Sequence, residues 1–157
     1  MPFIIDGQNL LRGVQKTFDQ FADISQHHLC KLISAYMQRK RTYANVVFDG
    51  TGPRDREVFF SIENIEVEFS GQDKEADDVI EILITQNSAP KRLKVVSDDR
   101  RIISAGQRRK AIHIDCISFW LGLTDELQKK RTPREPAAKR DGITNSETEK
   151  WMKEFGL

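Results

Sequence analysis

The sequence has little of the residues on which many common sites depend. It holds two cysteines, Cys30 and Cys116, and three histidines among 157 residues. No CxxC or Cys/His spacing occurs, so nothing in the sequence supports a zinc or redox site. We interpret both cysteines as buried small hydrophobic residues in a reducing compartment. The histidines follow no pattern, and we expect them to serve packing or the surface.

Long apolar runs are also missing. None approaches the roughly 20 residues that a membrane-spanning helix requires. The first residues pass directly into a strand pattern, without the charged and apolar segments of a signal peptide. No P-loop or GxGxxG motif occurs, which argues against a nucleotide cofactor. We therefore expect a cytoplasmic protein with no membrane partner and one main domain with a sizeable core.

Neither sign of charge dominates, since 25 basic and 24 acidic residues leave a net charge of +1. The distribution is less even. Acidic residues prevail from Val46 to Asp78, whereas the stretches 91–110 and 129–140 are basic. An acidic pocket flanked by basic surface suits a metal-dependent enzyme that acts on a phosphate backbone. Solvated helix faces explain such charge runs equally well.

Apolar patterns of two kinds alternate along the chain. Extended patterns predict strands at Phe3–Asp6, Ala44–Asp49, Ile65–Ser70, Leu93–Val96 and Ala111–Ile114. Helical periods predict helices within Asp23–Arg41, at Lys74–Gln86 and Asp99–Arg109, and through Phe119 and Leu127. This alternation predicts a three-layer α/β/α domain over residues 1–128, with a mainly parallel central sheet. The strand from Ile65, which has one polar face, is expected near an edge of the sheet.

The composition changes after Leu127. Residues 129–145 are rich in charge, hold two prolines and lack an apolar period, which predicts a linker. Ser146 and Glu149 have the spacing of a capping box and precede Trp151 and Phe155. Residues 146–157 are therefore predicted to form a short amphipathic helix, either docked on the domain or free for a partner. The oligomeric state stays open.

Aspartates stand where apolar runs end. Asp6, Asp49 and the pair Asp98-Asp99 follow three predicted strands, and Asp77-Asp78 open a predicted helix. The carboxyl ends of parallel strands share one edge of a sheet, where ligands bind in open α/β folds. Asp77 flanks the apolar stripe of its helix, whereas Asp78, about 100° further round, points nearer to solvent. An aspartate after a strand is also a common turn former or helix cap, so any single position has a structural alternative.

Carboxylates that converge repel one another. Two unit charges ~4 Å apart cost about 4 kcal/mol at an effective dielectric constant of about 20. Protonation, pairing with arginine, or binding of Mg²⁺ or Mn²⁺ would each relieve that repulsion. Oxygen ligands favour these hard cations over zinc, and four carboxylates are enough for one or two ions. Two ions would activate a water on one side and stabilise the leaving oxygen on the other.

Four motifs resemble those of the PIN-like nuclease superfamily, specifically the NYN domains of the YacP-like branch. They are Ile5-Asp6-Gly7-Gln8-Asn9-Leu10-Leu11, Val47-Phe48-Asp49-Gly50, Glu75-Ala76-Asp77-Asp78-Val79-Ile80-Glu81 and Val96-Ser97-Asp98-Asp99-Arg100. They occur in the family's order and span the chain from Pro2 to about Leu127. The resemblance implies a PIN-like fold and a metal-dependent endoribonuclease that hydrolyses RNA, leaving 5′-phosphate and 3′-hydroxyl ends. Single-stranded RNA is the favoured substrate, with the ribosome or RNA-processing proteins as candidate partners.

The resemblance also implies roles for individual residues. Asp6, Asp49, Asp77 and Asp99 are similar to the acidic metal-site residues, and Asn9 to the residue that orients the first aspartate or a phosphate. The catalytic candidates are thus Asp6, Asn9, Asp49, Asp77 and Asp99. Asp98, which stands where a small polar residue is common, is a further candidate metal ligand.

Other residues have auxiliary or binding roles in this hypothesis. Glu75 replaces a usual Thr or Ser, and Ser97 resembles the small hydroxyl residue before the last acid. These two and Asp78 are auxiliary candidates. The candidate RNA-binding residues near the expected edge are Arg54, Arg56, Lys74, Arg100 and Arg101. Ordinary surface charge is the alternative for each.

Three alternative proteins remain to be weighed. A degenerate PIN-like module would bind RNA without cutting it, and the retained acids argue against that. A receiver-type phosphoacceptor domain would want an acidic pair after the first strand and a Lys after the last, where this chain has Asp6-Gly7 and Asp115. A Toprim nuclease would want a Glu at the first strand and a later DxD, and neither fits.

Overall fold

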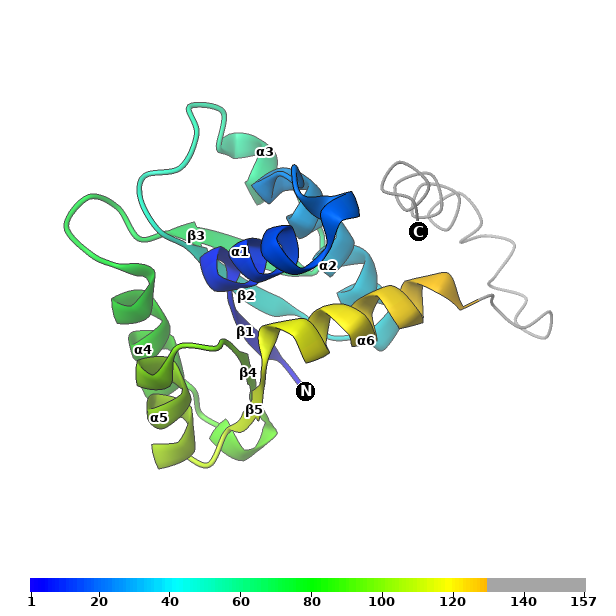
Figure 1. The fold of residues 1–157 in the computed structure, drawn as a ribbon. Helices are drawn as coiled ribbons and strands as arrows, with labels where there is room; N and C mark the ends of the chain where they lie inside the picture. The colour runs from blue at the N-terminus through cyan, green and yellow to red at the C-terminus, as the bar shows by residue number, and fades with distance from the viewer. Residues whose placement is uncertain (130–157) are drawn as a thin grey trace.

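The computed structural model describes residues 1–129. Residues 130–145 of the predicted linker and the whole of the predicted terminal helix lie outside the described residues. Within 1–129, five parallel strands form one sheet in the order β3-β2-β1-β4-β5 (Figure 1). The strands are β1 (Phe3–Asp6), β2 (Ala44–Phe48), β3 (Ile65–Phe69), β4 (Lys94–Val96) and β5 (Ile112–Ile114). The predicted parallel sheet is confirmed, as is the edge position of β3.

In this described part of the chain, six α-helices cover the two faces of the sheet (Figure 1). They are α1 (Gly7–Thr17), α2 (Gln26–Lys40), α3 (Glu57–Phe60), α4 (Ala76–Gln86), α5 (Arg100–Arg108) and α6 (Cys116–Gln128). Short 3₁₀ turns lie at Asp19–Phe21 and Pro90–Arg92. Helices α1, α2 and α6 pack on one face and α4 and α5 on the other, so the predicted three-layer architecture is confirmed. Among the helices within residues 1–129, none has the length and apolar character needed to cross a membrane.

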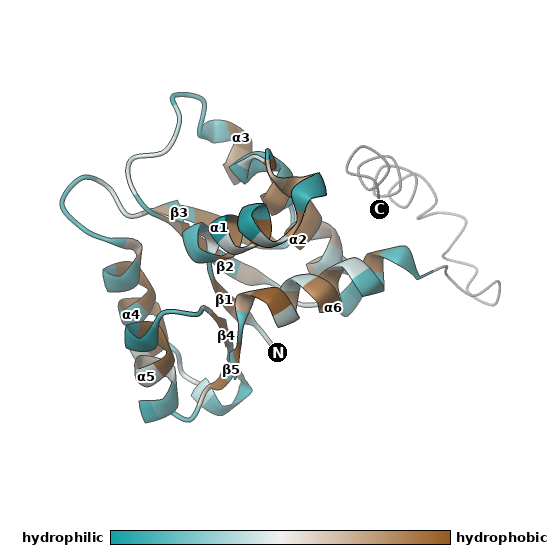
Figure 2. Ribbon diagram, in the orientation of Figure 1, coloured by the Kyte–Doolittle hydropathy of each residue, from teal (hydrophilic) through white to brown (hydrophobic). Residues whose placement is uncertain are grey.

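Alternating strand residues supply the two cores. Ile4 and Val47 face α4 and α5, whereas Phe3, Ile5 and Val46 face the other helices. This division follows from the period of two in a strand, which turns successive side chains to opposite faces. Hydropathy coloured on the ribbon places apolar residues along the strands and on the sheet-facing sides of the helices (Figure 2). A sheet buried on both faces is typical of parallel α/β folds.

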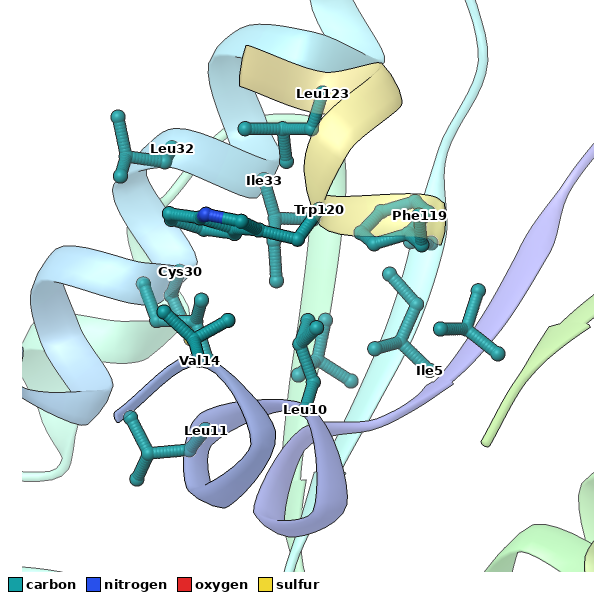
Figure 3. Close-up of a cluster of buried hydrophobic side chains, with 14 of the residues drawn as sticks. Ile5, Leu10, Leu11, Val14, Cys30, Leu32, Ile33, Phe119, Trp120 and Leu123 are labelled. Atoms are coloured by element: carbon teal, nitrogen blue, oxygen red, sulfur yellow. The ribbon is translucent and has the colours of Figure 1, made fainter. Parts of the chain in front are cut away.

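The larger core lies between β1, α1, α2 and α6 (Figure 3). Trp120 of α6 is 1% exposed and meets the ring of Phe21 edge to face, with centroids 5.1 Å apart. Leu10 and Val14 of α1 are fully buried in the same core. This packing anchors α1 directly after β1, which sets the position of the residues between them.

Helix α1 was not among the predicted elements. Its first residue, Gly7, was interpreted only as the end of the first strand. A Cβ at Gly7 would lie 2.7 Å from the ring of Phe48 in β2, so the close approach of α1 to the sheet requires glycine here. The helix begins without an intervening loop because the side chain of Asp6 accepts a hydrogen bond from the Asn9 N–H.

Candidate acidic site

A cavity of about 430 Å³ opens at the carboxyl edge of the sheet. Its lining residues come from the ends of β1 and β2 and the starts of α1, α4 and α5: Asp6, Gln8, Asn9, Arg12, Asp49, Gly50, Lys74, Glu75, Asp77 and Asp99. Strand order reverses direction between β1 and β4, and this is the position where open α/β sheets bind ligands. The structure thus brings Asp6, Asp49, Asp77 and Asp99, together with Asn9, Glu75 and Lys74, to one cavity.

Asp6 is the most enclosed of these acids, with 4% of its surface exposed. Its Oδ1 accepts a hydrogen bond from the Asn9 N–H at 3.2 Å, and its Oδ2 accepts one from the Ser97 hydroxyl at 3.1 Å. Burial raises the pKa of Asp6 to about 6, and the charges of Asp49 and Asp99 add to the effect, against the two hydrogen bonds. Asp6 therefore keeps its proton up to a pH at which ordinary aspartates are already ionised.

Ser97 joins two of the acids. It is fully buried, and its Oγ accepts the Asp99 N–H at 3.0 Å while donating to Asp6. A backbone N–H can only donate, so the hydroxyl hydrogen is left for the Asp6 carboxylate. The predicted auxiliary residue thus holds the end of β1 and the start of α5 at a fixed separation.

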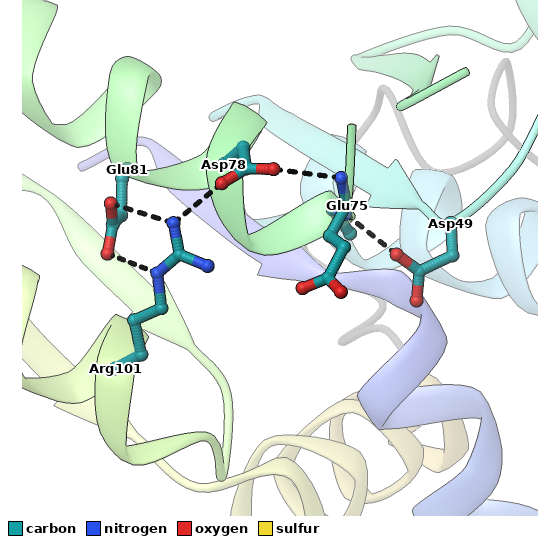
Figure 4. Close-up of polar contacts among 6 residues, drawn as sticks. Asp49, Glu75, Asp78, Glu81 and Arg101 are labelled. Carbon is teal, nitrogen blue, oxygen red and sulfur yellow. Dashed lines mark hydrogen bonds and ion pairs between the residues drawn. The ribbon is translucent and has the colours of Figure 1, made fainter. Parts of the chain in front are cut away.

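Asp49 ties the end of β2 to the start of α4 (Figure 4). Its Oδ1 accepts the N–H of Ala76, the first residue of α4, at 2.7 Å. The next residue, Gly50, has φ +86°, a conformation that side chains disfavour. Its N–H is held by the hydroxyl of Ser70 at 3.1 Å. This turn leaves Asp49 exposed at the cavity with Oδ2 available.

Asp77 and Asp99 face one another across the starts of α4 and α5. Burial raises the pKa of Asp77 to about 6, and the charge of Asp99 and a hydrogen bond with it act in the same direction. Asp99 caps α5, where its side chain accepts the N–H of Arg101 at 2.8 Å. One helix cap and one residue of a first helical turn thus place two carboxyl groups side by side.

Arg101, a candidate RNA-binding residue, is engaged elsewhere (Figure 4). Its guanidinium donates to Asp78 at 2.6 Å and to Glu81 at 2.7 Å, both on α4. Asp78 also accepts the N–H of Glu75 at 2.9 Å. These bonds link α4 to α5 beside the cavity but outside its lining. Arg101 and Asp78 thus join α4 to α5 next to Asp77 and Asp99.

Asp98 lies apart from the cavity lining. Its Oδ1 accepts the N–H of Cys116, the first residue of α6, at 3.0 Å. The side chain thus turns toward the start of α6, away from Asp6 and Asp77. Both Asp98 and Asp99 follow the same strand, and the sequence ranked Asp99 first only through the family resemblance.

Of the remaining basic candidates, only Lys74 lines the cavity. Arg54, Arg56 and Arg100 are exposed outside it, and Arg56 donates to the carbonyl of Thr51 at 3.2 Å. Two lining residues escaped the sequence interpretation, Gln8 and Arg12. They stand four residues apart on α1 and so share one face of that helix, a signal that a predicted α1 would have exposed.

No three His, Cys, Asp or Glu side chains within residues 1–129 form a group spaced to hold a metal ion as they stand. The chemistry of the lining is nevertheless that of a cation site. Its acceptors are carboxylate oxygens, which suit hard divalent ions. Burial is the main cause of the raised pKa values of Asp6 and Asp77, and the charges of neighbouring carboxylates add to it, so a bound cation would favour the ionised form of both acids.

Fold and cavity together define the class: a PIN-like α/β domain with acids gathered at the carboxyl edge of its sheet. The YacP-like NYN domain model matches residues 3–155, and the chain belongs to this family. The match extends past Leu127, the expected end of the resemblance. NYN domains are a PIN-like nuclease family, which supports a nuclease role related to RNA and leaves the receiver-type and Toprim alternatives without support.

Two solved structures have a similar fold. The crystal structure of Rae1 (YacP) from Bacillus subtilis matches with a TM-score of 0.68 and 19% identity, covering 99% of this chain and 92% of that one. A tryptophan-to-leucine mutant of the same protein matches with a TM-score of 0.64 and 16% identity, covering 96% and 99%. A comparison with curated proteins finds no match.

Proposed function

We propose that the protein is an endoribonuclease that hydrolyses RNA phosphodiester bonds with Mg²⁺ or Mn²⁺ as cofactor. The observation that carries this proposal is the meeting of Asp6, Asp49, Asp77 and Asp99, from four separate segments, in one cavity. Burial, with a smaller contribution from neighbouring carboxylates, raises the pKa of Asp6 to about 6, and a bound cation would offset both effects. Membership of a nuclease family supports the same function.

The four aspartates would hold the ion. Asp49 uses Oδ1 to accept a backbone N–H, which leaves Oδ2 for a cation. Asp99 also uses Oδ1 for a backbone N–H, and a cation would replace the proton that it shares with Asp77. Asp49 is exposed, so its side chain can turn toward a ligand without a change of the backbone. A divalent ion bound here supplies a Lewis acid that lowers the pKa of water and neutralises charge on phosphoryl oxygens. No histidine lines the cavity among the described residues, and this chemistry needs none.

Two basic side chains oppose the repulsion between the acids and RNA. Arg12 of α1 and Lys74, which precedes α4, both line the cavity. They are placed to pair with the phosphates that flank the scissile bond. We expect a single-stranded substrate, because a phosphate in a flexible strand enters a cavity more readily than one in a rigid duplex.

The test is cleavage of a 5′-labelled single-stranded RNA in Mn²⁺ or Mg²⁺, compared with EDTA. Asp6→Asn should lower the rate by roughly 100-fold or more, because Lewis-acid catalysis contributes several kcal/mol to the barrier. Asp19→Asn is the matched control, since Asp19 is exposed in the 3₁₀ turn after α1. Equal rates in the two variants would refute the assignment. RNA binding by the parent protein without metal-dependent cleavage would favour the degenerate RNA-binding module instead.

A further inference from the structure

The side-chain amide oxygen of Asn9 accepts hydrogen bonds from two donors. This oxygen, Oδ1, accepts the backbone N–H of Asp98 at 2.9 Å and the thiol of Cys116 at 3.2 Å. Asp98 and Cys116 belong to the segments that begin α5 and α6, whereas Asn9 lies in the first turn of α1. Three segments distant in sequence thus meet at one amide oxygen.

This bonding decides which end of the amide faces the cavity. A backbone N–H cannot accept, so the atom that meets it must be the oxygen and not the nitrogen. The Nδ2 group lies on the side of the planar amide opposite the oxygen that accepts these two hydrogen bonds, and Asn9 lines the cavity. Asn9 therefore offers two N–H donors to whatever the cavity binds.

Cys116 is built into this arrangement. Its thiol is fully buried, and its own N–H is held by the Asp98 carboxylate at 3.0 Å. Burial raises the pKa of the Cys116 thiol, and the charge of Asp98 acts in the same direction. The sulfur stays protonated and donates to Asn9, so Asp98 and Cys116 bind both each other and the amide.

The cavity distinguishes sharply between donors and acceptors. Its four aspartates are acceptors when ionised, as a cation requires, and an N–H donor cannot bind a cation. A phosphoryl oxygen is an acceptor and needs donors. The lining supplies them through the side chains of Gln8, Asn9, Arg12 and Lys74. Of these four, only Asn9 has its orientation locked by hydrogen bonds from other segments within residues 1–129.

We propose that Asp98 and Cys116 are positioning residues, which fix the Asn9 amide so that its N–H donors are free for a phosphoryl oxygen of the bound RNA, the role that the family resemblance leads us to expect for Asn9. This inference rests on the proposed function and deepens it. It gives Asp98 a role without metal ligation. It also gives a buried cysteine a role in the site, where the sequence suggested only packing.

The first experiment measures kcat/KM of the full chain on single-stranded RNA. Asn9→Asp, which keeps the size and removes both donors, should lower it by roughly 10- to 150-fold, the range of a hydrogen bond to a charged group. Cys116→Ala should lower it by about 2- to 10-fold and Cys116→Ser should restore it, since serine keeps a donor. Cys30→Ala is the matched control, because Cys30 is also fully buried but lies in the core between α2 and its neighbours.

Two variants of Asp98 distinguish a positioning role of this residue from metal ligation. Asp98→Asn keeps an acceptor for the Cys116 N–H and should retain activity within about twofold, whereas Asp98→Ala should lose about as much as Cys116→Ala. If Asp98 were a metal ligand, Asp98→Asn and Asp98→Ala would both lose most of their activity. Equal activity of the parent, Asn9→Asp and Cys116→Ala would overturn the proposal while leaving the nuclease intact.

A second measurement does not depend on cleavage. The side-chain amide protons of Asn9 are identified in a ¹H–¹⁵N spectrum as the pair missing from Asn9→Asp. Adding a single-stranded deoxyoligonucleotide in EDTA should shift this pair in the parent protein, and Cys116→Ala should alter its position before any addition. An unshifted pair would overturn the donor role. A shifted pair in a protein that cuts no RNA would support the donor role and refute the proposed function.

Discussion

Replacing Asp6 by asparagine should stabilise the metal-free protein at neutral pH, although the same change removes a proposed ligand. Asp6 is 4% exposed, and burial raises its pKa from 3.8 to about 6. The folded chain therefore holds a proton that the unfolded chain has already lost between about pH 4 and pH 6. Folding stability falls as the pH rises through this window, because the unfolded state loses its proton first.

The size of the effect follows from the two pKa values. A pKa raised from 3.8 to about 6 corresponds to about 3 kcal/mol of lost stability at pH 8 and about 1.5 kcal/mol at pH 5. The asparagine of the variant does not ionise and escapes both costs. In a domain of this size, 1 kcal/mol moves the melting temperature by roughly 2–4 °C. In the variant, the gain in the free energy of unfolding should therefore be larger at pH 8 than at pH 5, by about 1.5 kcal/mol.

Urea unfolding in EDTA at pH 5 and pH 8 measures this directly, followed by tryptophan fluorescence from the buried Trp120. Asp19→Asn serves again as the control and should change neither midpoint. Millimolar Mn²⁺ at pH 8 should then stabilise the parent and leave Asp6→Asn unchanged, because the ion would offset the charge that the variant lacks. A variant less stable than the parent at pH 8 in EDTA, or a gain independent of pH, would refute the reasoning.

Three further predictions concern the metal, the helix clamp and the fold. Millimolar Mg²⁺ or Mn²⁺ should raise the melting temperature of the parent in calorimetry, and Asp99→Asn should remove that gain; unchanged melting of the parent would count against the site. Arg101→Gln should slow RNA cleavage about 5- to 10-fold, as for lost positioning contacts, without changing the salt dependence of RNA binding. Arg108→Gln, at the exposed far end of α5, is its control, and a reduced salt slope in Arg101→Gln would instead show a phosphate contact. Gly7→Ala should destabilise by about 1–3 kcal/mol in urea unfolding, because its Cβ would lie 2.7 Å from an aromatic ring of β2, whereas Gly13→Ala, with its nearest contact at 3.7 Å, should not destabilise.

The sequence was sufficient for the sheet and most helices because their signals are local. Strand periods and apolar stripes predicted every strand of the described residues and the helices α2, α4, α5 and α6. Helix α1 was missed because its local cap, Asp6, is followed by a glycine, and the reason for that glycine is not local. Gly7 favours a turn by itself, and only the ring of Phe48, far along the chain in β2, explains why glycine begins a helix there. Because α1 was not predicted, the helix face that carries Gln8 and Arg12 into the cavity was missed as well.

For the acids, the sequence selected four aspartates that the structure brings to one cavity, but it posed a choice that the structure does not make. A helix cap and a cavity acid were treated as alternatives at each position, yet Asp6 and Asp99 are both. The reason is geometric, since helices that follow parallel strands begin at the same edge where the strands end. A carboxylate there has two oxygens with several lone pairs, enough to accept an N–H and still face the cavity. The N–H dipoles of the helix starts also favour negative charge at this edge. Capping therefore helps to gather the acids, and the feature that separates Asp99 from Asp98 is which helix start each one reaches, α5 or α6.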